Sequence, residues 1–353
     1  MKVLVLGGTG AMGKHLVDLL SEDNIETWVT SRSVKKDFAT VKYVRGNALE
    51  EIFIKPLIEQ NFDCVVDFMV YGSPADFKER LDLFLNHTKQ YIYLSSSRVY
   101  AQSENLITEN SPRLLDVSLD KEFLATNEYA LIKAREENIL FNCGRRNWTI
   151  IRPYITYSET RLQLGVLEKE EWLYRAMQGH KIVIAEEMLK KATTLTYGRD
   201  VAKGIKALIG KEDALGEAFH ITQDKEIKWE DAWNIYKDEL GKASFNSELY
   251  FCSLEELATI HQQRYQIFYD RMYDRRFDNS KIKRFIDTSS FVTPEEGLRS
   301  CISDFIQKNM AVQLPFRASF EGRADCITKE WINPLKIKGN KNKIRYIVRR
   351  LGI

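Results

Sequence analysis

Short apolar runs alternate with amphipathic stretches along the first half of the chain. Residues 15–20 and 77–85 repeat apolar side chains at helical spacing. Five apolar-rich runs have the length of buried strands: residues 3–6, 26–30, 41–44, 62–68 and 91–94. Strands that alternate with helices in this way predict an α/β fold, a Rossmann-type doubly wound parallel sheet that is covered on both faces.

The pattern loosens after about residue 158, which predicts two domains. We expect residues 1–157, with a returning segment at about 190–225, to form a dinucleotide-binding Rossmann domain. Residues 158–189 and 226–335 then form a smaller, mixed C-terminal domain that binds the substrate. Within that domain, the composition of residues 162–177 suits a helix on the substrate side.

Two clusters in the second domain each have two interpretations. Trp229, Trp233 and Tyr236 recur at helical spacing, which favours core packing over a base-stacking surface. Residues 262–276 are rich in Arg and Tyr. They form either a diphosphate-binding surface or a solvated helix whose arginines pair with neighbouring aspartates.

Residues 336–353 predict a basic amphipathic tail, because they hold seven Lys and Arg residues and no acidic one. Ile344, Ile347, Val348 and Leu351 share one face of the expected helix. Such a helix docks on its own domain or on a partner subunit of a homodimer, which is the favoured interpretation. The alternative is peripheral contact with an anionic membrane surface.

The net charge and the cysteine and histidine content bear on the expected partners, compartment and metal binding. The formal net charge of the 353-residue chain is only +2, so bulk charge gives no reason to expect a nucleic-acid partner. The five cysteines are scattered, without a CxxC pair, which predicts reduced thiols and a cytoplasmic localisation. We expect no signal peptide and no membrane-crossing segment. The five histidines are isolated, so we expect no metal site.

A glycine-spaced turn joins the first predicted strand to the first predicted helix. Gly7, Gly10 and Gly13 follow one another at three-residue spacing. The first glycine permits a tight turn, the second lets the backbone approach a pyrophosphate, and the third lets the helix pack close to the strand. The N-terminus of the helix then faces the phosphates. We expect these cofactor-binding residues in the turn: Gly7, Thr9, Gly10, Ala11, Met12 and Gly13.

The ends of the second and third predicted strands bear on the choice of cofactor. In this fold an acidic residue after the second strand accepts from the ribose 2′-OH, whereas an arginine accommodates a 2′-phosphate. Arg32, supported by Ser31, therefore favours NADP over NAD, and the alternative is a solvated basic loop. Asn47 lies in the turn where the adenine edge would be read.

Candidate catalytic groups follow the fifth predicted strand. Ser95, Ser96 and Ser97 end this strand at the sheet edge where open α/β sheets hold active sites, although a merely polar turn is the alternative. Tyr129 and Lys133 are one helical turn apart, so their side chains share a face. A neighbouring ammonium favours the phenolate form, which suits Tyr129 to exchange a proton.

These motifs together resemble the extended short-chain dehydrogenase/reductases of the NAD-dependent epimerase/dehydratase family. The resemblance covers residues 1 to about 308, and besides the glycine turn it rests on residues 95–100 (SSSRVY), Tyr129-xxx-Lys133 and residues 151–153 (IRP). It implies that Tyr129 is the catalytic acid/base, that Ser96 hydrogen-bonds the developing carbonyl, and that Lys133 holds the nicotinamide ribose and tunes Tyr129. It also implies that the cofactor site is lined by Phe68, Met69 and Pro153.

The chain departs from the family pattern on the substrate side. Ser97 and Arg98 stand where sugar-nucleotide dehydratases carry an Asp-Glu pair, which disfavours dehydration. Ile155 stands where many nucleotide-sugar epimerases carry an Asn that touches the substrate diphosphate. Met69 and Val70 replace the usual small residues after the fourth strand.

The resemblance therefore implies an NAD(P)-dependent epimerase or reductase that acts on a sugar, with a nucleotide-linked sugar as the first candidate. The alternative is a cofactor-binding regulatory or RNA-associated module of the same fold without turnover. The intact set of Ser96, Tyr129 and Lys133 favours the enzyme, because a binding module does not need all three groups.

Overall fold

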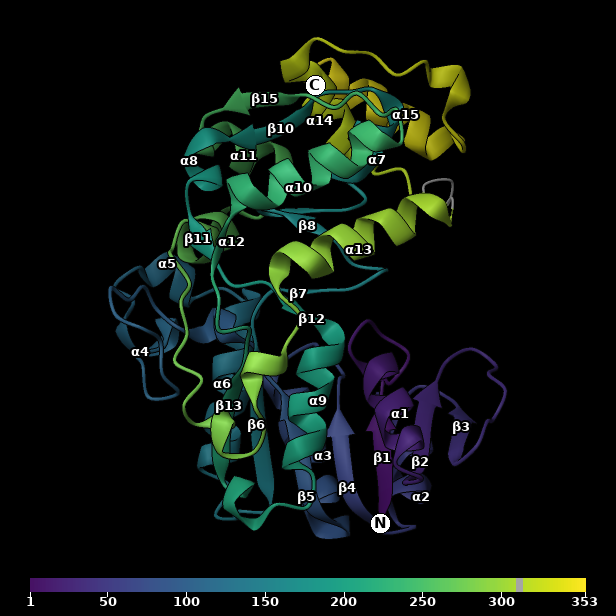
Figure 1. Cartoon of the computed structure of the whole chain (residues 1–353), viewed down its shortest axis with the longest axis vertical. Helices are drawn as coiled ribbons and strands as arrows, with labels where there is room; N and C mark the ends of the chain where they lie inside the picture. Colours follow the sequence, from purple (N-terminus) through teal and green to yellow (C-terminus); the bar gives the residue numbers. More distant parts are fainter. Residues whose placement is uncertain (309–313) are drawn as a thin grey trace. The chain divides into compact units, whose positions relative to one another are not determined.

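The computed structural model describes residues 1–308 and 314–353, and the chain divides into two compact units (Figure 1). The first unit comprises Met1–Thr156, Thr194–Lys225 and Arg276–Val292, and the second comprises Tyr157–Thr193, Glu226–Arg275 and Thr293–Ile353. The structure thus places residues 276–292 in the first unit and not, as predicted, in the substrate-binding domain. The reason is that Ile282 and Phe291 are buried in the apolar core of the first unit.

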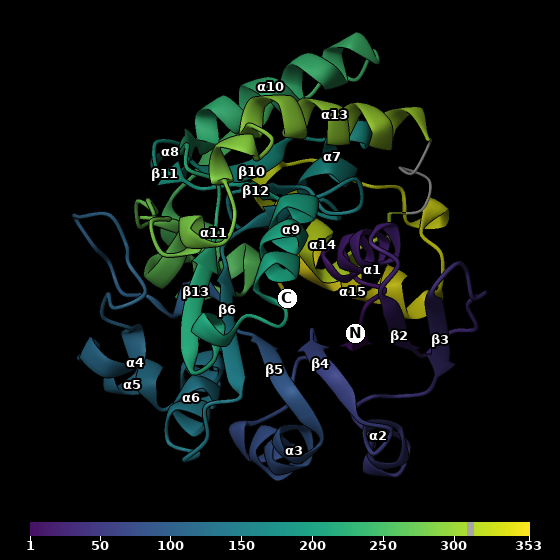
Figure 2. The ribbon, with the colours of Figure 1, turned by 60° about the horizontal axis from the view of Figure 1, so that its bottom comes forward.

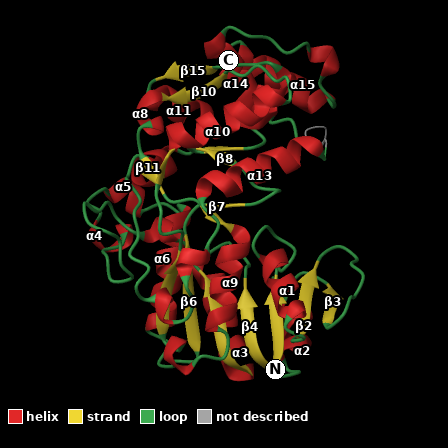
Figure 3. Cartoon of the chain, viewed as in Figure 1, coloured by secondary structure: helices red, strands yellow, loops and turns green. Residues whose placement is uncertain are grey.

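A seven-stranded sheet forms the centre of the first unit, and all of its neighbouring strands are parallel (Figure 3). The strand order is β13-β6-β5-β4-β1-β2-β3. The strands are β1 Lys2–Leu6, β2 Glu26–Ser31, β3 Val41–Arg45, β4 Phe62–Asp67, β5 Thr88–Leu94, β6 Trp148–Pro153 and β13 Glu217–Ile221. Because the chain winds outward from β1 in both directions, the sheet is doubly wound. The predicted fold class is confirmed.

Helices cover both faces of this sheet, as Figure 2 shows, with α1 and α9 on one face and α2, α3 and α6 on the other. Alternate residues of β1 explain the two layers, since Val3 and Val5 join one core and Leu4 and Leu6 join the other. The helices of this unit are α1 Gly13–Glu22, α2 Glu51–Ile58, α3 Pro74–His87, α4 Leu114–Val117, α5 Lys121–Leu124, α6 Tyr129–Phe141 and α9 Gly198–Leu208.

The second unit combines helices with pairs of very short strands. Its helices are α7 Trp172–Gln178, α8 Glu186–Leu189, α10 Trp229–Lys242, α11 Leu254–His261, α12 Arg264–Gln266, α13 Pro294–Gln307, α14 Ala318–Thr328 and α15 Asn340–Arg350. Its strands are β8 Gln163–Leu164, β9 Leu167–Glu168, β10 Ile182–Ala185, β11 Ala192–Thr193, β14 Ile227–Lys228 and β15 Leu249–Cys252. Two further short strands, β7 Thr156–Tyr157 and β12 Thr196–Tyr197, lie near the boundaries of the units.

The helix predicted over residues 162–177 is wrong in its first half. β8 and β9 form an antiparallel hairpin there, and α7 begins only at Trp172. Gly165 explains the difference, because its φ of 59° lies in the left-handed region and turns the chain back on itself.

The aromatic stripe on α10 is part of the core, as predicted. Trp229, Trp233 and Tyr236 are all buried. The arginine-rich segment is self-paired, because Arg271 and Arg275 are buried and form ion pairs with Asp270. These two arginines therefore do not form a diphosphate-binding surface.

The predicted tail belongs to the second unit, where α15 packs against α14. No helix in the described parts of the chain combines the length and the apolar character that a bilayer-crossing segment needs.

Candidate active site

The glycine turn follows β1 and leads into α1. Gly7 has a φ of 68°, in the region that favours glycine, and its N–H donates to Thr30 Oγ1 at 3.0 Å. A Cβ at Gly13 would lie 2.7 Å from Gly8 Cα, so glycine is needed for α1 to approach the turn this closely. The fold itself therefore requires glycine at both positions.

Gly10 differs from the other two glycines of the motif. Its φ is not in the left-handed region, and a Cβ there would meet Gly7 O at 3.7 Å, an ordinary contact. The backbone around it is open, since Thr9 and Gly10 are exposed and Ala11 and Met12 are half-buried. A glycine that packing does not require, beside a helix N-terminus, fits the close approach of dinucleotide phosphates to the backbone.

Two of the predicted lining residues border this turn. A Cβ at Gly7 would lie 3.1 Å from Met69 Sδ and 3.6 Å from Phe68 Cβ. Pro153 is buried at the end of β6, with β5 and β4 between it and β1. All three residues therefore lie at the carboxyl edge of the sheet, with Phe68 and Met69 next to the turn.

The residues predicted to contact the adenosine part of the cofactor differ in exposure and in their hydrogen bonds within the protein. Ser31 is buried and donates to Ser33 O at 2.9 Å, whereas Arg32 is exposed. Asn47 donates to Glu50 Oε1 at 3.1 Å and accepts from Leu49 N–H at 3.2 Å. The Asn47 side chain thus organises its own turn, while the Arg32 guanidinium is available to a ligand.

The three serines after β5 have different roles. Ser95 Oγ donates to Glu137 Oε1 at 2.6 Å, and Ser97 Oγ donates to the backbone oxygen of Arg152 at 2.7 Å. Ser96 Oγ accepts from Arg98 N–H at 3.2 Å, and no acceptor for its own proton is found among the described residues. Ser96 is therefore the serine that retains a proton to donate.

Tyr129 is the first residue of α6, and its half-buried ring lies near two cations. The Arg98 guanidinium carbon is 5.2 Å from the ring centroid, and Lys133 Nζ is 5.9 Å from it. Arg98 also forms an ion pair with Glu128, which caps α6 by accepting from Ala130 N–H at 2.5 Å. Two cations therefore flank the Tyr129 ring, and Glu128 fixes one of them.

Lys133 is held by partners that sequence reasoning missed. Its ammonium donates to Tyr93 OH at 2.8 Å and lies 3.2 Å from Glu136 Oε2, and Tyr93 OH in turn donates to Glu136. Lys133 and Glu136 are 1% and 0% exposed. Burial raises the pKa of the Glu136 carboxyl, while Lys133 and Tyr93 oppose this shift. The i,i+3 spacing of Lys133 and Glu136 on one helix was the available sequence signal.

A second buried polar cluster lies on the adjacent strand. The Asp67 carboxylate accepts from the hydroxyls of Tyr71 and Tyr91, each at 2.6 Å, and from Met69 N–H at 2.8 Å. Burial raises the pKa of Asp67, and these hydrogen bonds counteract the shift. The bond to Met69 N–H fixes the backbone that borders the glycine turn.

An ion pair inside the first unit connects β6 to α6. Arg152 donates from Nε and one terminal nitrogen to the two oxygens of Glu137, at 2.7 and 2.8 Å. Its other terminal nitrogen donates to Tyr100 OH at 2.9 Å. Glu137 holds the pKa of Arg152 above its usual value despite burial. This arginine therefore has a structural role and keeps α6, with Tyr129 and Lys133, next to the serine segment.

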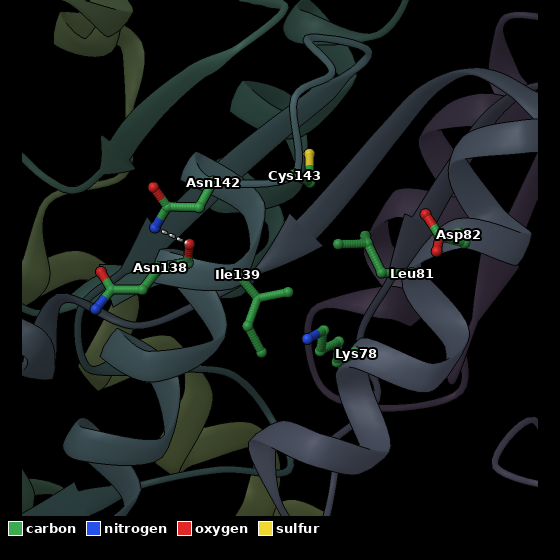
Figure 4. Close-up of a pocket in the computed structure, with 7 residues that line it drawn as sticks. All are labelled: Lys78, Leu81, Asp82, Asn138, Ile139, Asn142 and Cys143. Carbon is green, nitrogen blue, oxygen red and sulfur yellow. Dashed lines mark hydrogen bonds between the residues drawn. The ribbon is translucent and has the colours of Figure 1, made fainter.

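A separate pocket of about 440 Å³ lies between α3 and α6 (Figure 4). It is lined by Lys78, Leu81, Asp82, Asn138, Ile139, Asn142 and Cys143. Asn138 lies nine positions after Tyr129 in α6, which is about 13.5 Å along the helix axis. The pocket therefore contains none of the candidate catalytic groups.

Comparison with known proteins gives a family match and a common fold. The model of the NAD dependent epimerase/dehydratase family matches residues 3–222. The chain is 25% identical over 245 residues to the chloroplast stem-loop binding protein of 41 kDa b from Arabidopsis thaliana. That match covers 65% of this chain and 60% of the relative, which is less than two thirds of its length.

Solved structures share the fold. The UDP-glucuronic acid 4-epimerase from Bacillus cereus, in complex with UDP-glucuronic acid and NAD, has a TM-score of 0.67 at 16% identity, with coverage of 88% of this chain and 100% of that one. The enzyme WbmH from Bordetella bronchiseptica, in complex with NAD+, has a TM-score of 0.63 at 16% identity, with coverage of 87% and 98%. At this identity the likeness establishes a common fold.

Proposed function

Because the chain belongs to the NAD dependent epimerase/dehydratase family, we propose that it is an NAD(P)-dependent epimerase or reductase of a nucleotide-linked sugar. One observation carries the proposal. Arg98 lies between the two groups: its backbone N–H donates to Ser96, which has a proton to donate, and its guanidinium lies beside the phenol of Tyr129. This is the pair of groups that oxidation of a secondary alcohol needs.

The chain's residues would divide the chemistry as follows. Tyr129, as phenolate, takes the proton of the sugar hydroxyl, and Ser96 donates a hydrogen bond to the oxygen as it becomes a carbonyl. Lys133 and Arg98 stabilise the negative charge on the Tyr129 oxygen. A bound nicotinamide dinucleotide supplies the hydride acceptor. An epimerase would return the hydride to the opposite face of the keto sugar. A reductase would run the step in reverse: a reduced cofactor would supply the hydride to a keto sugar, Tyr129 would supply the proton, and the alcohol would leave as the product.

Two features support the cofactor assignment. The open backbone at Gly10 suits the pyrophosphate, and the residue after β2 is Arg32 and not an acid. We propose NADP as the preferred cofactor on this ground. Arg32→Ala should weaken NADP binding at least about tenfold and leave NAD binding unchanged, because only NADP carries the 2′-phosphate. Equal losses for both cofactors would rule out this preference.

The substrate class is proposed from the related structures. One of them holds UDP-glucuronic acid together with NAD, which makes UDP-linked sugars the first compounds to test. Dehydration is not proposed, since Ser97 Oγ donates to the Arg152 backbone and Arg98 pairs with Glu128, so neither supplies an acid.

The deciding experiment combines two measurements. Mass spectrometry of the purified protein should find nicotinamide dinucleotide, and NMR should then detect conversion of UDP-hexoses or UDP-hexuronic acids. Tyr129→Phe should abolish conversion but keep cofactor affinity. Tyr250→Phe removes a half-buried hydroxyl in the second unit and serves as the matched control. Conversion that survives in Tyr129→Phe would refute the assigned chemistry.

A second candidate function is a binding module without turnover. Two observations favour it: Lys133 already has Tyr93 and Glu136 as partners, and the matched relative is named a stem-loop binding protein. In that case the protein would bind stem-loop RNA and convert no sugar nucleotide. RNA binding unaffected by Tyr129→Phe, in a protein that is inactive on the whole panel, would replace the enzyme proposal.

A further inference from the structure

The C-terminal helix α15 docks on α14 through Tyr346. This side chain is fully buried, and its hydroxyl donates to Asp325 Oδ2 at 2.7 Å and accepts from Ile332 N–H at 2.6 Å. A Cβ at Gly322 of α14 would lie 2.6 Å from Tyr346 O, so the two helix backbones are close. The side of α15 that carries Tyr346 is therefore the docked side.

Only part of the apolar face predicted for this helix docks. Ile347 packs against the core around Tyr346. Ile344, Val348 and Leu351 are spaced i, i+4 and i+7 on the side away from Tyr346. Ile344 is 63% exposed and Leu351 is 58% exposed. The helix is thus packed against its own unit and still presents an apolar stripe to solvent.

Other exposed apolar side chains occur in the same segment. Residues 331–353 contain five of the 15 exposed large apolar side chains described in the chain: Trp331, Leu335, Ile344, Leu351 and Ile353. Leu335 is 85% exposed and Ile353 is 74% exposed. Ile344 and Leu351 share one face of α15. Exposed apolar side chains that gather on one face mark an interaction surface, whereas single exposed apolar residues need no explanation.

Positive charge accompanies these side chains. Residues 336–353 carry seven positive charges, and the last acidic residue of the sequence is Glu330. Since the whole chain sums to +2, the other 335 residues sum to −5. Five of the basic side chains have no carboxylate partner among the described residues: Lys336, Lys338, Lys341, Lys343 and Arg345.

We propose that residues 331–353, the tail surface, bind the surface of an anionic lipid bilayer. Exposed aliphatic side chains enter the boundary between headgroups and acyl chains, and flanking lysines and arginines bind anionic headgroups. RNA would attract the same charges but would leave Leu335, Ile344 and Leu351 in water. RNA-binding surfaces instead use stacked aromatic side chains. In the tail surface, the exposed aromatic side chain of Trp331 already has the Arg350 guanidinium over its ring, with the guanidinium carbon 5.5 Å from the ring centroid.

Vesicle flotation tests the proposal on the full chain. Vesicles of phosphatidylcholine mixed with phosphatidylglycerol should bind the protein, and vesicles of phosphatidylcholine alone should bind it much less. Ile344→Ser with Leu351→Ser should lower the partition coefficient at least about tenfold. The matched control is Ile52→Ser with Leu119→Ser, which removes aliphatic side chains that are 87% and 95% exposed elsewhere.

A second variant tests the electrostatic part. Lys341→Gln with Arg345→Gln should lower binding to the phosphatidylglycerol vesicles by about fivefold for each charge removed, and added salt should have the same effect. Equal binding by the Ile344→Ser, Leu351→Ser variant and the wild type would overturn the proposal. The proposal would also be overturned if the protein bound stem-loop RNA but bound neither kind of vesicle.

Discussion

We predict that the first unit loses stability when the buried pair of Lys133 and Glu136 is broken. Glu136→Gln keeps the shape of the side chain and an acceptor for Tyr93, but it removes the negative charge 3.2 Å from the Lys133 ammonium. Two unit charges at that separation interact by about 5 kcal/mol at an effective dielectric constant of about 20. Loss of one partner of a buried pair costs about 3–5 kcal/mol. Because the acceptor for Tyr93 is retained, we expect a loss at the lower end, about 3 kcal/mol.

Hydrogen exchange measures this loss at individual amides of the first unit, whereas a melting temperature reports on the chain with less detail. The slowest amides of β4, β5 and α6 should exchange about 150 times faster in Glu136→Gln. In the double variant with Lys133→Met, the loss should be smaller than the sum of the single losses by more than about 1 kcal/mol.

Glu186→Gln is the matched control, since Glu186 pairs with Lys190 across an exposed turn of α8, and it should leave the exchange of the first unit unchanged. Unchanged exchange in Glu136→Gln would show that Glu136 does not neutralise Lys133.

Two further predictions concern the glycine turn and the second unit. Gly10→Ala should leave stability nearly unchanged but abolish dinucleotide binding in a fluorescence titration, whereas Gly13→Ala should lower the melting temperature, because its Cβ would clash with the turn. In the second unit, burial raises the pKa of Glu321 from 4.5 to about 7, and Asp325 raises the pKa of His180 above 6.5. Both groups hold protons more tightly when folded, so the stability they contribute is complete at low pH and is lost as the pH rises through these raised values. The melting temperature should therefore fall between pH 5 and pH 8, and it should fall less in Glu321→Gln, as differential scanning calorimetry can check; an equal fall in both proteins would refute this assignment.

The sequence predicted the fold and part of the site because the relevant signals are local. Strand length, helical spacing and the Gly7, Gly10 and Gly13 turn each lie within a few residues, and the sheet confirms the fold class. The choice of Ser96 among three serines came from the resemblance, and its hydrogen bonds now supply a physical reason for that choice. The catalytic roles themselves stay predictions.

The remaining features depend on contacts between distant parts of the chain. Residues 276–292 have no local pattern that assigns them to the first unit, and only the burial of Ile282 and Phe291 does so. In the tail, helical spacing grouped four apolar side chains on one face but could not say which of them dock. Ile347 packs against the core around Tyr346, whereas Ile344 and Leu351 are exposed. The docked side is set by Tyr346 and its bond to Asp325, 21 residues earlier in the chain.

Arg98 and the buried pair of Lys133 and Glu136 together set the charge around Tyr129. In place of an acid, the chain has Arg98, whose guanidinium carbon is nearer the Tyr129 ring than is Lys133 Nζ, at 5.2 against 5.9 Å. Lys133 shares its charge with Glu136, so Arg98 supplies positive charge where that of Lys133 is partly neutralised. Arg98 is fixed in turn by Glu128 at the start of α6. The ring of Tyr129 is therefore flanked by two cations whose positions are held by ion pairs. For the proton transfer that we propose, such an arrangement lowers the reorganisation needed.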